Sequence, residues 1–274
     1  MRDFPQELVD KVIDELFALV GRDNSYQGYS KRSRGPRKPV WGISDYSLVS
    51  RAWAGSTQKH HFHILYLDSP DILEKWFSGI QPDPTGVSRH VRKLALEGFD
   101  LGDFEDFEDH LLALTQVEYL TVEDCDCIPH HPSTVQWFLT IGSSLVDLRI
   151  NNSPVAPHTI TSLLAVLPLL QSLQFHNFEI PDDYEHEEDP PAPPRIPFFE
   201  GANYFALRSD QGHIYPEGSL DWIPASACFA RLAVDMPCSL DHPDLVNQWL
   251  ASSCATLTGL AIEDDPEGTP PPVT

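Results

Sequence analysis

The chain has 274 residues, of which 41% are hydrophobic, and it carries a formal net charge of −23. This length and hydrophobic content permit one large or two modest domains with a sizeable core and argue against wholesale disorder. The longest apolar run, residues 163–170, is far too short to span a bilayer, and the opening "MRDFPQEL" lacks the pattern of a signal peptide. We therefore expect an intracellular protein, in the cytoplasm, the nucleus or both.

The charge is distributed unevenly along the chain. Residues 1–93 contain 14 Lys and Arg against 11 Asp and Glu, whereas residues 94–274 contain 4 Lys and Arg against 30 Asp and Glu. The acidic half should repel nucleic acid and anionic membranes, and it would favour a basic target protein. The alternative is that the acidic residues only keep a leucine-rich surface soluble.

Two amphipathic segments open the chain. Between residues 4 and 20 the apolar side chains recur on one stripe of a predicted helix, with Asp3 as a plausible N-cap and Gly21 as its stop. A second helix is predicted from about Ser44, and a short third segment, 56–62, follows Gly55. Helices of this size enclose little core, so they must pack on the rest of the chain or on another protein.

These segments resemble a known motif. "FPQELVDKVIDEL", "SLVSRAW" and "HFHILYL", in this order and spacing, are similar to an F-box of the kind found in large fungal F-box families. In that family the helices dock on the Skp-type adaptor of a cullin–RING ubiquitin ligase, which is an example of helix-in-groove recognition. The resemblance implies that adaptor contact, or its support, involves Pro5, Leu8, Ile13, Leu48, Val49 and Trp53.

An insertion distinguishes this segment from the usual F-box. Residues 21–42 are rich in Gly, Ser and Arg and show no periodicity, which predicts a mobile loop inside an F-box-like domain at 1–62. Its "KRSRGPRK" is either a solvated basic loop or a nuclear-import signal.

An apolar-x-x-apolar-x-apolar pattern then recurs at intervals of about 25–32 residues, a period typical of leucine-rich repeats. Helix-like segments separate the predicted strands at 69–80, 104–114, 132–142, 157–167 and 242–254. We expect an α/β (or α+β) repeat fold: an F-box of two or three helices, then a leucine-rich-repeat-like solenoid of seven to eight strand–helix units at 63–265. The eight triplets are Phe62/Leu65/Leu67, Val91/Leu94/Leu96, Val117/Leu120/Val122, Leu145/Leu148/Ile150, Leu170/Leu173/Phe175, Ala202/Phe205/Leu207, Phe229/Leu232/Val234 and Leu257/Leu260/Ile262.

The repeats resemble degenerate members of that class. Cys125 occupies the Asn/Cys position after a strand, but Phe99, Ser153 and Phe178 do not match it, which predicts that the side-chain ladder of regular repeats is lost. An acidic, proline-rich loop is predicted at 181–198 and a disordered tail at 266–274.

The residues that alternate with the apolar positions should point to solvent on one concave face, where a target protein would bind. Tyr119 is a plausible aromatic anchor, and the alternative is an ordinary solvated surface. The predicted target-binding residues are Glu97, Tyr119, Thr121, Glu123, Asp147, Arg149, Asn151, Gln174 and His176.

Chemistry within the chain is not indicated. The common catalytic and nucleotide-binding motifs are missing from the sequence, and Cys125, Cys127, His130 and His131 do not match a common zinc spacing. We therefore expect no cofactor, no metal and no catalytic residue. The leading hypothesis is a non-catalytic substrate-recognition subunit of a Skp–cullin–F-box ubiquitin ligase; the alternative is a repeat scaffold whose N-terminal helices only cap the solenoid.

Overall fold

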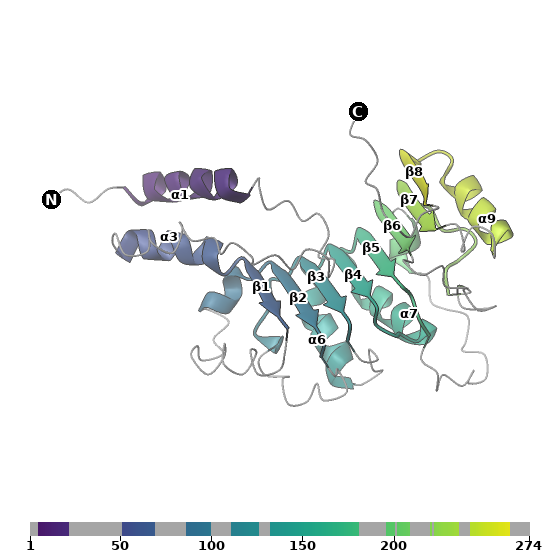
Figure 1. Ribbon diagram of the computed structural model, residues 1–274, viewed down its shortest axis with the longest axis horizontal. Helices are drawn as coiled ribbons and strands as arrows, with labels where there is room; N and C mark the ends of the chain where they lie inside the picture. The colour runs from purple at the N-terminus through teal and green to yellow at the C-terminus, as the bar shows by residue number, and fades with distance from the viewer. Residues whose placement is uncertain are drawn as a thin grey trace.

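The structure is a computed structural model that describes residues 5–21, 51–68, 86–99, 111–125, 132–180, 196–200, 202–208, 220, 222–235 and 242–263. Its centre is an eight-stranded sheet in which every strand is parallel to its neighbours and the strands follow one another in chain order (Figure 1). With α-helices between its strands, the chain has an α/β fold, as the sequence predicts.

Each strand falls on one of the eight apolar triplets. The strands are β1 (Ile64–Leu67), β2 (Lys93–Glu97), β3 (Tyr119–Glu123), β4 (Asp147–Asn151), β5 (Ser172–His176), β6 (Tyr204–Arg208), β7 (Arg231–Asp235) and β8 (Gly259–Glu263). The register aligns equivalent positions of successive repeats: Leu94 pairs with Leu120, and Leu120 with Leu148. Because side chains alternate between the two faces of a strand, this register places the repeated apolar residues together on one face.

The helices cover that apolar face. In the order of the chain they include α6 (Pro132–Gly142), α7 (Pro157–Val166) and α9 (Pro243–Ser253), each of which begins with proline at its first position. Their inward side chains, such as Trp137, Ile160 and Trp249, are almost fully buried in the same core as the strand leucines. One face of the sheet is thus closed by helices, and no helix of the described residues covers the opposite face, which we call the open face.

A close approach between α6 and α7 requires glycine. A Cβ atom on Gly142 would lie 2.5 Å from the carbonyl oxygen of Val166. Such a contact is too short for any side chain, so the last turn of α6 packs against the end of α7 only because residue 142 has none.

The residue directly after each of strands β2 to β5 adopts a left-handed conformation. These residues are Gly98, Asp124, Asn152 and Asn177, with φ values of 70°, 50°, 47° and 54°. Glycine, aspartate and asparagine tolerate this region best. In this conformation each backbone N–H donates to the carbonyl of the last residue of the next strand, at 2.7–3.0 Å.

Three of these residues form a side-chain ladder across the sheet. The amide of Asn152 donates to Asp124 Oδ1 at 2.9 Å, and the amide of Asn177 donates to Asn152 Oδ1 at 2.6 Å. The sequence predicts that the ladder at the Asn/Cys position is lost; the structure has a polar ladder one residue earlier, at a position that the prediction does not consider. The Asn/Cys position itself is buried, with Phe99, Cys125, Ser153 and Phe178 between 1% and 6% exposed.

The N-terminal helices lie beside each other beyond the β1 end of the sheet (Figure 1). Helix α1 (Gln6–Gly21) packs against α3 (Arg51–His61), and α3 in turn contacts the 3-10 helix η3 (Val87–His90). Segment 56–62 is not separate: α3 continues through Gly55 as far as His61.

The predicted acidic loop ends earlier than expected. Residues 197–200 form the 3-10 helix η5 (Pro197–Glu200), and Ile196 and Phe198 are both 4% exposed. Burial of these apolar side chains in the core explains the difference, because core contacts order the end of a segment that its composition alone assigns to a loop. Residues 22–42, 69–80, 181–195 and 266–274, on which other predictions depend, lie outside the described residues.

Candidate functional site

The open face of the sheet carries three rows of side chains, set by the strand register. The first row runs from Lys93 through Tyr119, Asp147, Ser172 and Tyr204. The second runs from Ala95 through Thr121, Arg149, Gln174 and Ala206, and the third from Glu97 through Glu123, Asn151, His176 and Arg208. All nine predicted target-binding residues therefore lie on one face, as the alternation of the strands requires.

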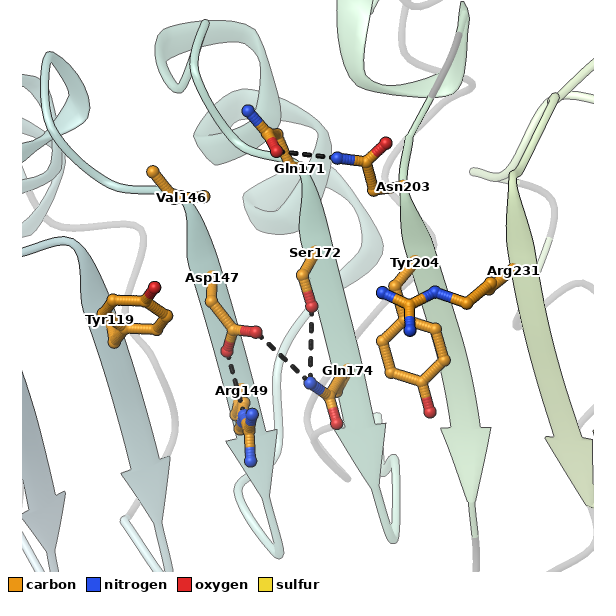
Figure 2. Close-up of a pocket in the computed structure, with 10 residues that line it drawn as sticks. All are labelled: Tyr119, Val146, Asp147, Arg149, Gln171, Ser172, Gln174, Asn203, Tyr204 and Arg231. Atoms are coloured by element: carbon orange, nitrogen blue, oxygen red, sulfur yellow. Dashed lines mark hydrogen bonds and ion pairs between the residues drawn. The ribbon is translucent and has the colours of Figure 1, made fainter. Parts of the chain in front are cut away.

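A hollow of about 360 Å³ occupies the first two rows between β3 and β7. Figure 2 shows its lining side chains, which come from strands β3 to β7 and from the residues just before β4, β5 and β6. The lining consists of Tyr119, Val146, Asp147, Arg149, Gln171, Ser172, Gln174, Asn203, Tyr204 and Arg231.

Hydrogen bonds tie the floor of the hollow together. Arg149 Nε donates to Asp147 Oδ1 at 2.9 Å, while Gln174 Nε2 donates to Asp147 Oδ2 at 3.4 Å and to Ser172 Oγ at 3.3 Å (Figure 2). Asp147 is only 9% exposed, so these partners compensate the charge of a nearly buried carboxylate. Because each carboxylate oxygen of Asp147 accepts one of these hydrogen bonds, Asp147 also holds Arg149 and Gln174 in defined positions.

Two aromatic side chains stand at opposite sides of the hollow, each with a cation over its ring. Lys93 Nζ lies 4.9 Å from the ring centroid of Tyr119, and Arg231 Cζ lies 5.5 Å from that of Tyr204. Arg208 also donates from Nη2 to the hydroxyl of Tyr204 at 3.3 Å. Cation–π contacts of this kind orient a long basic side chain across an aromatic surface.

The few arginines of the strongly acidic half of the protein are concentrated on this face. Residues 94–274 contain four basic residues other than histidine, Arg149, Arg195, Arg208 and Arg231. Three of these four lie on strands β4, β6 and β7, on or beside the hollow. Burial is the main cause that lowers the pKa of Lys93; the positive charge of Arg149 lowers it further, while Asp147 and Glu118 oppose the change.

The structure brings together only some of the predicted target-binding residues. Tyr119, Asp147, Arg149 and Gln174 line the hollow, whereas the remaining five lie on the same face outside it. Those five are Glu97, Thr121, Glu123, Asn151 and His176.

The expectation that all nine residues point freely to solvent is wrong for three of them. Thr121, Glu123 and Asp147 are only 7%, 8% and 9% exposed. Adjacent strands lie about 4.8 Å apart, and the register places each of the three beside a long or aromatic side chain: Thr121 beside Arg149, Glu123 beside Glu97, and Asp147 beside Tyr119.

Sequence reasoning missed the far side of the hollow. The prediction uses four repeats, those of β2 to β5, whereas Tyr204 and Arg231 lie on β6 and β7. The repeat spacing alone could have identified both residues. Extending the register from β5 by one strand places Tyr204 in the row of Tyr119, and extending it by a second strand adds Arg231.

The N-terminal helices α1 and α3 present a second surface. Val9 and Ile13 are 0% exposed, whereas Leu8 and Val12 are 49% and 41% exposed. On a helix, residues four positions apart lie on the same side, so Leu8 and Val12 form a continuous apolar stripe that faces away from α3. We call Leu8 and Val12 the outer stripe.

The other predicted adaptor-binding residues differ in exposure. Pro5 is exposed, Trp53 is half-buried, and Ile13 is fully buried, which leaves it a supporting role only. Leu48 and Val49 lie outside the described residues.

Polar side chains fasten α1 to α3 along the inner face. Gln6 and Asp10 both hydrogen-bond to Ser56, and Asp14 accepts from His60 Nε2 at 2.6 Å. The hydrogen bond from Ser56 is the main reason that the pKa of Asp10 is lowered. For Asp14, burial opposes the hydrogen bonds from His60 and Lys59, but the pKa is still lowered.

The cysteine and histidine residues near β3 do not assemble a metal site in the described part of the chain. Cys125 is 2% exposed and its Sγ lies 3.5 Å from the carbonyl oxygen of Glu123, while burial raises its pKa to about 11. Cys127, His130 and His131 lie outside the described residues, and elsewhere no three His, Cys, Asp or Glu side chains of the described residues gather around a common point.

Comparison with models of known protein families finds no match to this chain. Comparison with curated proteins likewise finds no significant match. No helix in the described ranges combines the length and the hydrophobicity that crossing a bilayer requires.

Proposed function

We propose that the protein is a non-catalytic adaptor that holds a target protein on the open face of its sheet and docks through its N-terminal helices. The docking partner is a Skp-type adaptor of a cullin–RING ubiquitin ligase, as the resemblance of residues 3–67 to an F-box implies. In this role the chain brings a target close to the ligase, which raises the effective concentration of the target without forming or breaking bonds itself. The sheet then corresponds to a degenerate leucine-rich-repeat solenoid.

The observation that carries the proposal is the outer stripe. Leu8 and Val12 are about half exposed on a helix whose inward residues Val9 and Ile13 are fully buried. Apolar surface that the described residues leave exposed is typical of protein-interaction sites. Covering the exposed half of each side chain should contribute about 1 kcal/mol per residue to docking.

Co-purification with a Skp-type adaptor tests docking. Leu8→Asp/Val12→Asp should abolish adaptor binding, because it places two charges in the contact, and should leave the fold intact because both positions are exposed. Leu139→Asp is the matched control: Leu139 is 47% exposed on α6, far from α1 in the chain, and its replacement should leave binding unchanged. Adaptor binding that survives the double change, or that the control abolishes equally, would refute the assignment.

The burial of the inward side chains of α1 favours a second function, that of a repeat scaffold without ligase coupling. Val9 and Ile13 are completely buried, and α3 packs on η3 immediately before β2, as a cap on the first repeat would. If capping is the only role, the wild-type chain binds no Skp-type adaptor, while Ile13→Ala lowers the midpoint of urea unfolding for the whole sheet.

A further inference from the structure

The hollow carries a positive charge, although the chain as a whole is strongly negative. Its ten lining residues include one acid, Asp147, and two arginines, Arg149 and Arg231. The ion pair with Arg149 at 2.9 Å neutralises Asp147, so the hollow keeps a positive charge from Arg231. Arg231 is exposed, lies over the ring of Tyr204, and makes no ion pair with another of the described residues.

From this arrangement we propose that the hollow binds an extended acidic segment of the target protein, with carboxylate or phosphate groups at Arg149 and Arg231. The proposal rests on the proposed function, because it names the class of target that the open face selects. A guanidinium group presents five N–H donors in a planar fork that matches carboxylate and phosphate oxygens, and the bond with Asp147 uses the Nε donor of Arg149.

The spacing of the two arginines defines the segment. Arg149 is on β4 and Arg231 on β7, three strand spacings apart and two residues apart along the strands, which places their Cα atoms roughly 16 Å apart. A single carboxylate or phosphate cannot reach both, but two acidic side chains about four residues apart in an extended segment can, at roughly 3.3 Å per residue. Between them, Tyr204 and the polar groups of Ser172 and Gln174 would contact the middle of the segment.

Nucleic acid fits the hollow less well than an acidic peptide. Glu97 and Glu123 occupy the β2 and β3 positions of the third row, where a continuous chain of phosphates would meet like charges. The 26 excess acidic charges of residues 94–274 act at longer range, and at physiological ionic strength they are screened beyond about 8 Å. Local contacts inside the hollow therefore decide which group binds there.

Fluorescence anisotropy with the purified full-length chain tests the proposal. Four labelled peptides share one unstructured Gly/Ser/Pro sequence and carry, four residues apart, two glutamates, two phosphoserines, two serines or two lysines. We expect the glutamate or the phosphoserine peptide, or both, to bind, and the serine and lysine peptides not to bind. Which of the two acidic peptides binds more tightly distinguishes a carboxylate target from a phosphorylated one.

Variants assign binding to the hollow. Arg231→Gln should weaken binding of the acidic peptide about tenfold, because it removes a charge-assisted hydrogen bond, and Arg231→Lys should restore part of the loss. Arg92→Gln is the matched control: Arg92 pairs with Glu118 at 3.1 Å, does not line the hollow, and should change binding less than about twofold.

Several outcomes would overturn the proposal. They are tighter binding of the lysine peptide, no binding of either acidic peptide up to about 1 mM, or an equal loss with Arg92→Gln and Arg231→Gln. Urea unfolding of Arg231→Gln and Arg231→Lys shows whether either variant is misfolded. If both unfold at lower urea than the wild type, the salt dependence of wild-type binding replaces them as the test: an ionic contact weakens with salt, so binding that salt does not weaken would overturn the proposal. Adaptor co-purification tests the outer stripe and the peptide assay tests the hollow, so a failure of adaptor docking and a failure of acidic-peptide binding are distinguishable.

Discussion

Replacement of Asn152 offers a sharp test of how successive repeats are joined. Asn152 donates to Asp124 at 2.9 Å, accepts from Asn177 at 2.6 Å, and has a φ of 47°. Asn152→Ala removes both side-chain hydrogen bonds, at about 0.5–1.5 kcal/mol each, and leaves a residue with a Cβ in the left-handed region, at a further 1 kcal/mol or so. The free energy of unfolding should fall by about 2–4 kcal/mol.

Asn152→Gly separates the two causes. Glycine loses the same hydrogen bonds but adopts a positive φ without strain, and part of this advantage is offset by the greater freedom of glycine in the unfolded chain. We expect Asn152→Gly to be about 0.5–1 kcal/mol more stable than Asn152→Ala.

Urea unfolding followed by tryptophan fluorescence and circular dichroism measures both variants. Asn203→Ala is the control, because Asn203 is exposed and makes one side-chain hydrogen bond, to Gln171 at 2.7 Å; its cost should stay below about 0.5 kcal/mol. If Asn152→Ala is as stable as the wild type, or if glycine is no better than alanine, the ladder does not stabilise the fold in the way described.

Three further predictions concern a core tryptophan, the histidine just before β1, and two cysteines. Trp249→Ala should cost about 3–5 kcal/mol in urea unfolding, because this side chain is 0% exposed and packs edge-on against Phe205 and Phe229; a loss below 1 kcal/mol would contradict the packing. Burial, together with nearby positive charges, lowers the pKa of His63 to about 4, so the neutral form is the stable one. Stability from this histidine should be present above pH 6.5 and lost as the pH falls toward 4, by about 1 kcal/mol between pH 7 and 5 after allowance for solvent screening; a His63→Asn variant that loses as much stability as the wild type over this range would refute the assignment. Alkylation mapped by mass spectrometry should label exposed Cys254 rapidly and buried Cys125 only when the chain unfolds, and equal labelling rates would show that Cys125 is accessible.

The periodic part of the fold could be predicted from the sequence because its determinants are local and repeated. Each apolar triplet contains its own period-2 alternation, and each of the three described helices α6, α7 and α9 begins at a proline that the sequence displays. The left-handed residues after the strands are also determined locally. Gly98, Asp124, Asn152 and Asn177 each follow a strand directly, whereas the prediction considered only the next position along the chain.

The candidate site was only half predictable because its members come from different repeats. Asp147 and Arg149 are two residues apart on one strand, so their shared face follows from the alternation of side chains. Tyr204 and Arg231 join them only through the pairing of β5 with β6 and β6 with β7. Likewise, the sequence marked Leu8 and Ile13 as equivalent apolar residues, and packing against α3 buries one and leaves the other exposed.

By itself, the sequence determined the strands, most of the described helices, and the face on which each strand residue lies, because these depend on backbone alternation and on residues within a few positions of one another. Only the tertiary structure decided that a chain with a net charge of −23 has a basic hollow, since the sign of a local field depends on which few charges are brought together and not on their sum.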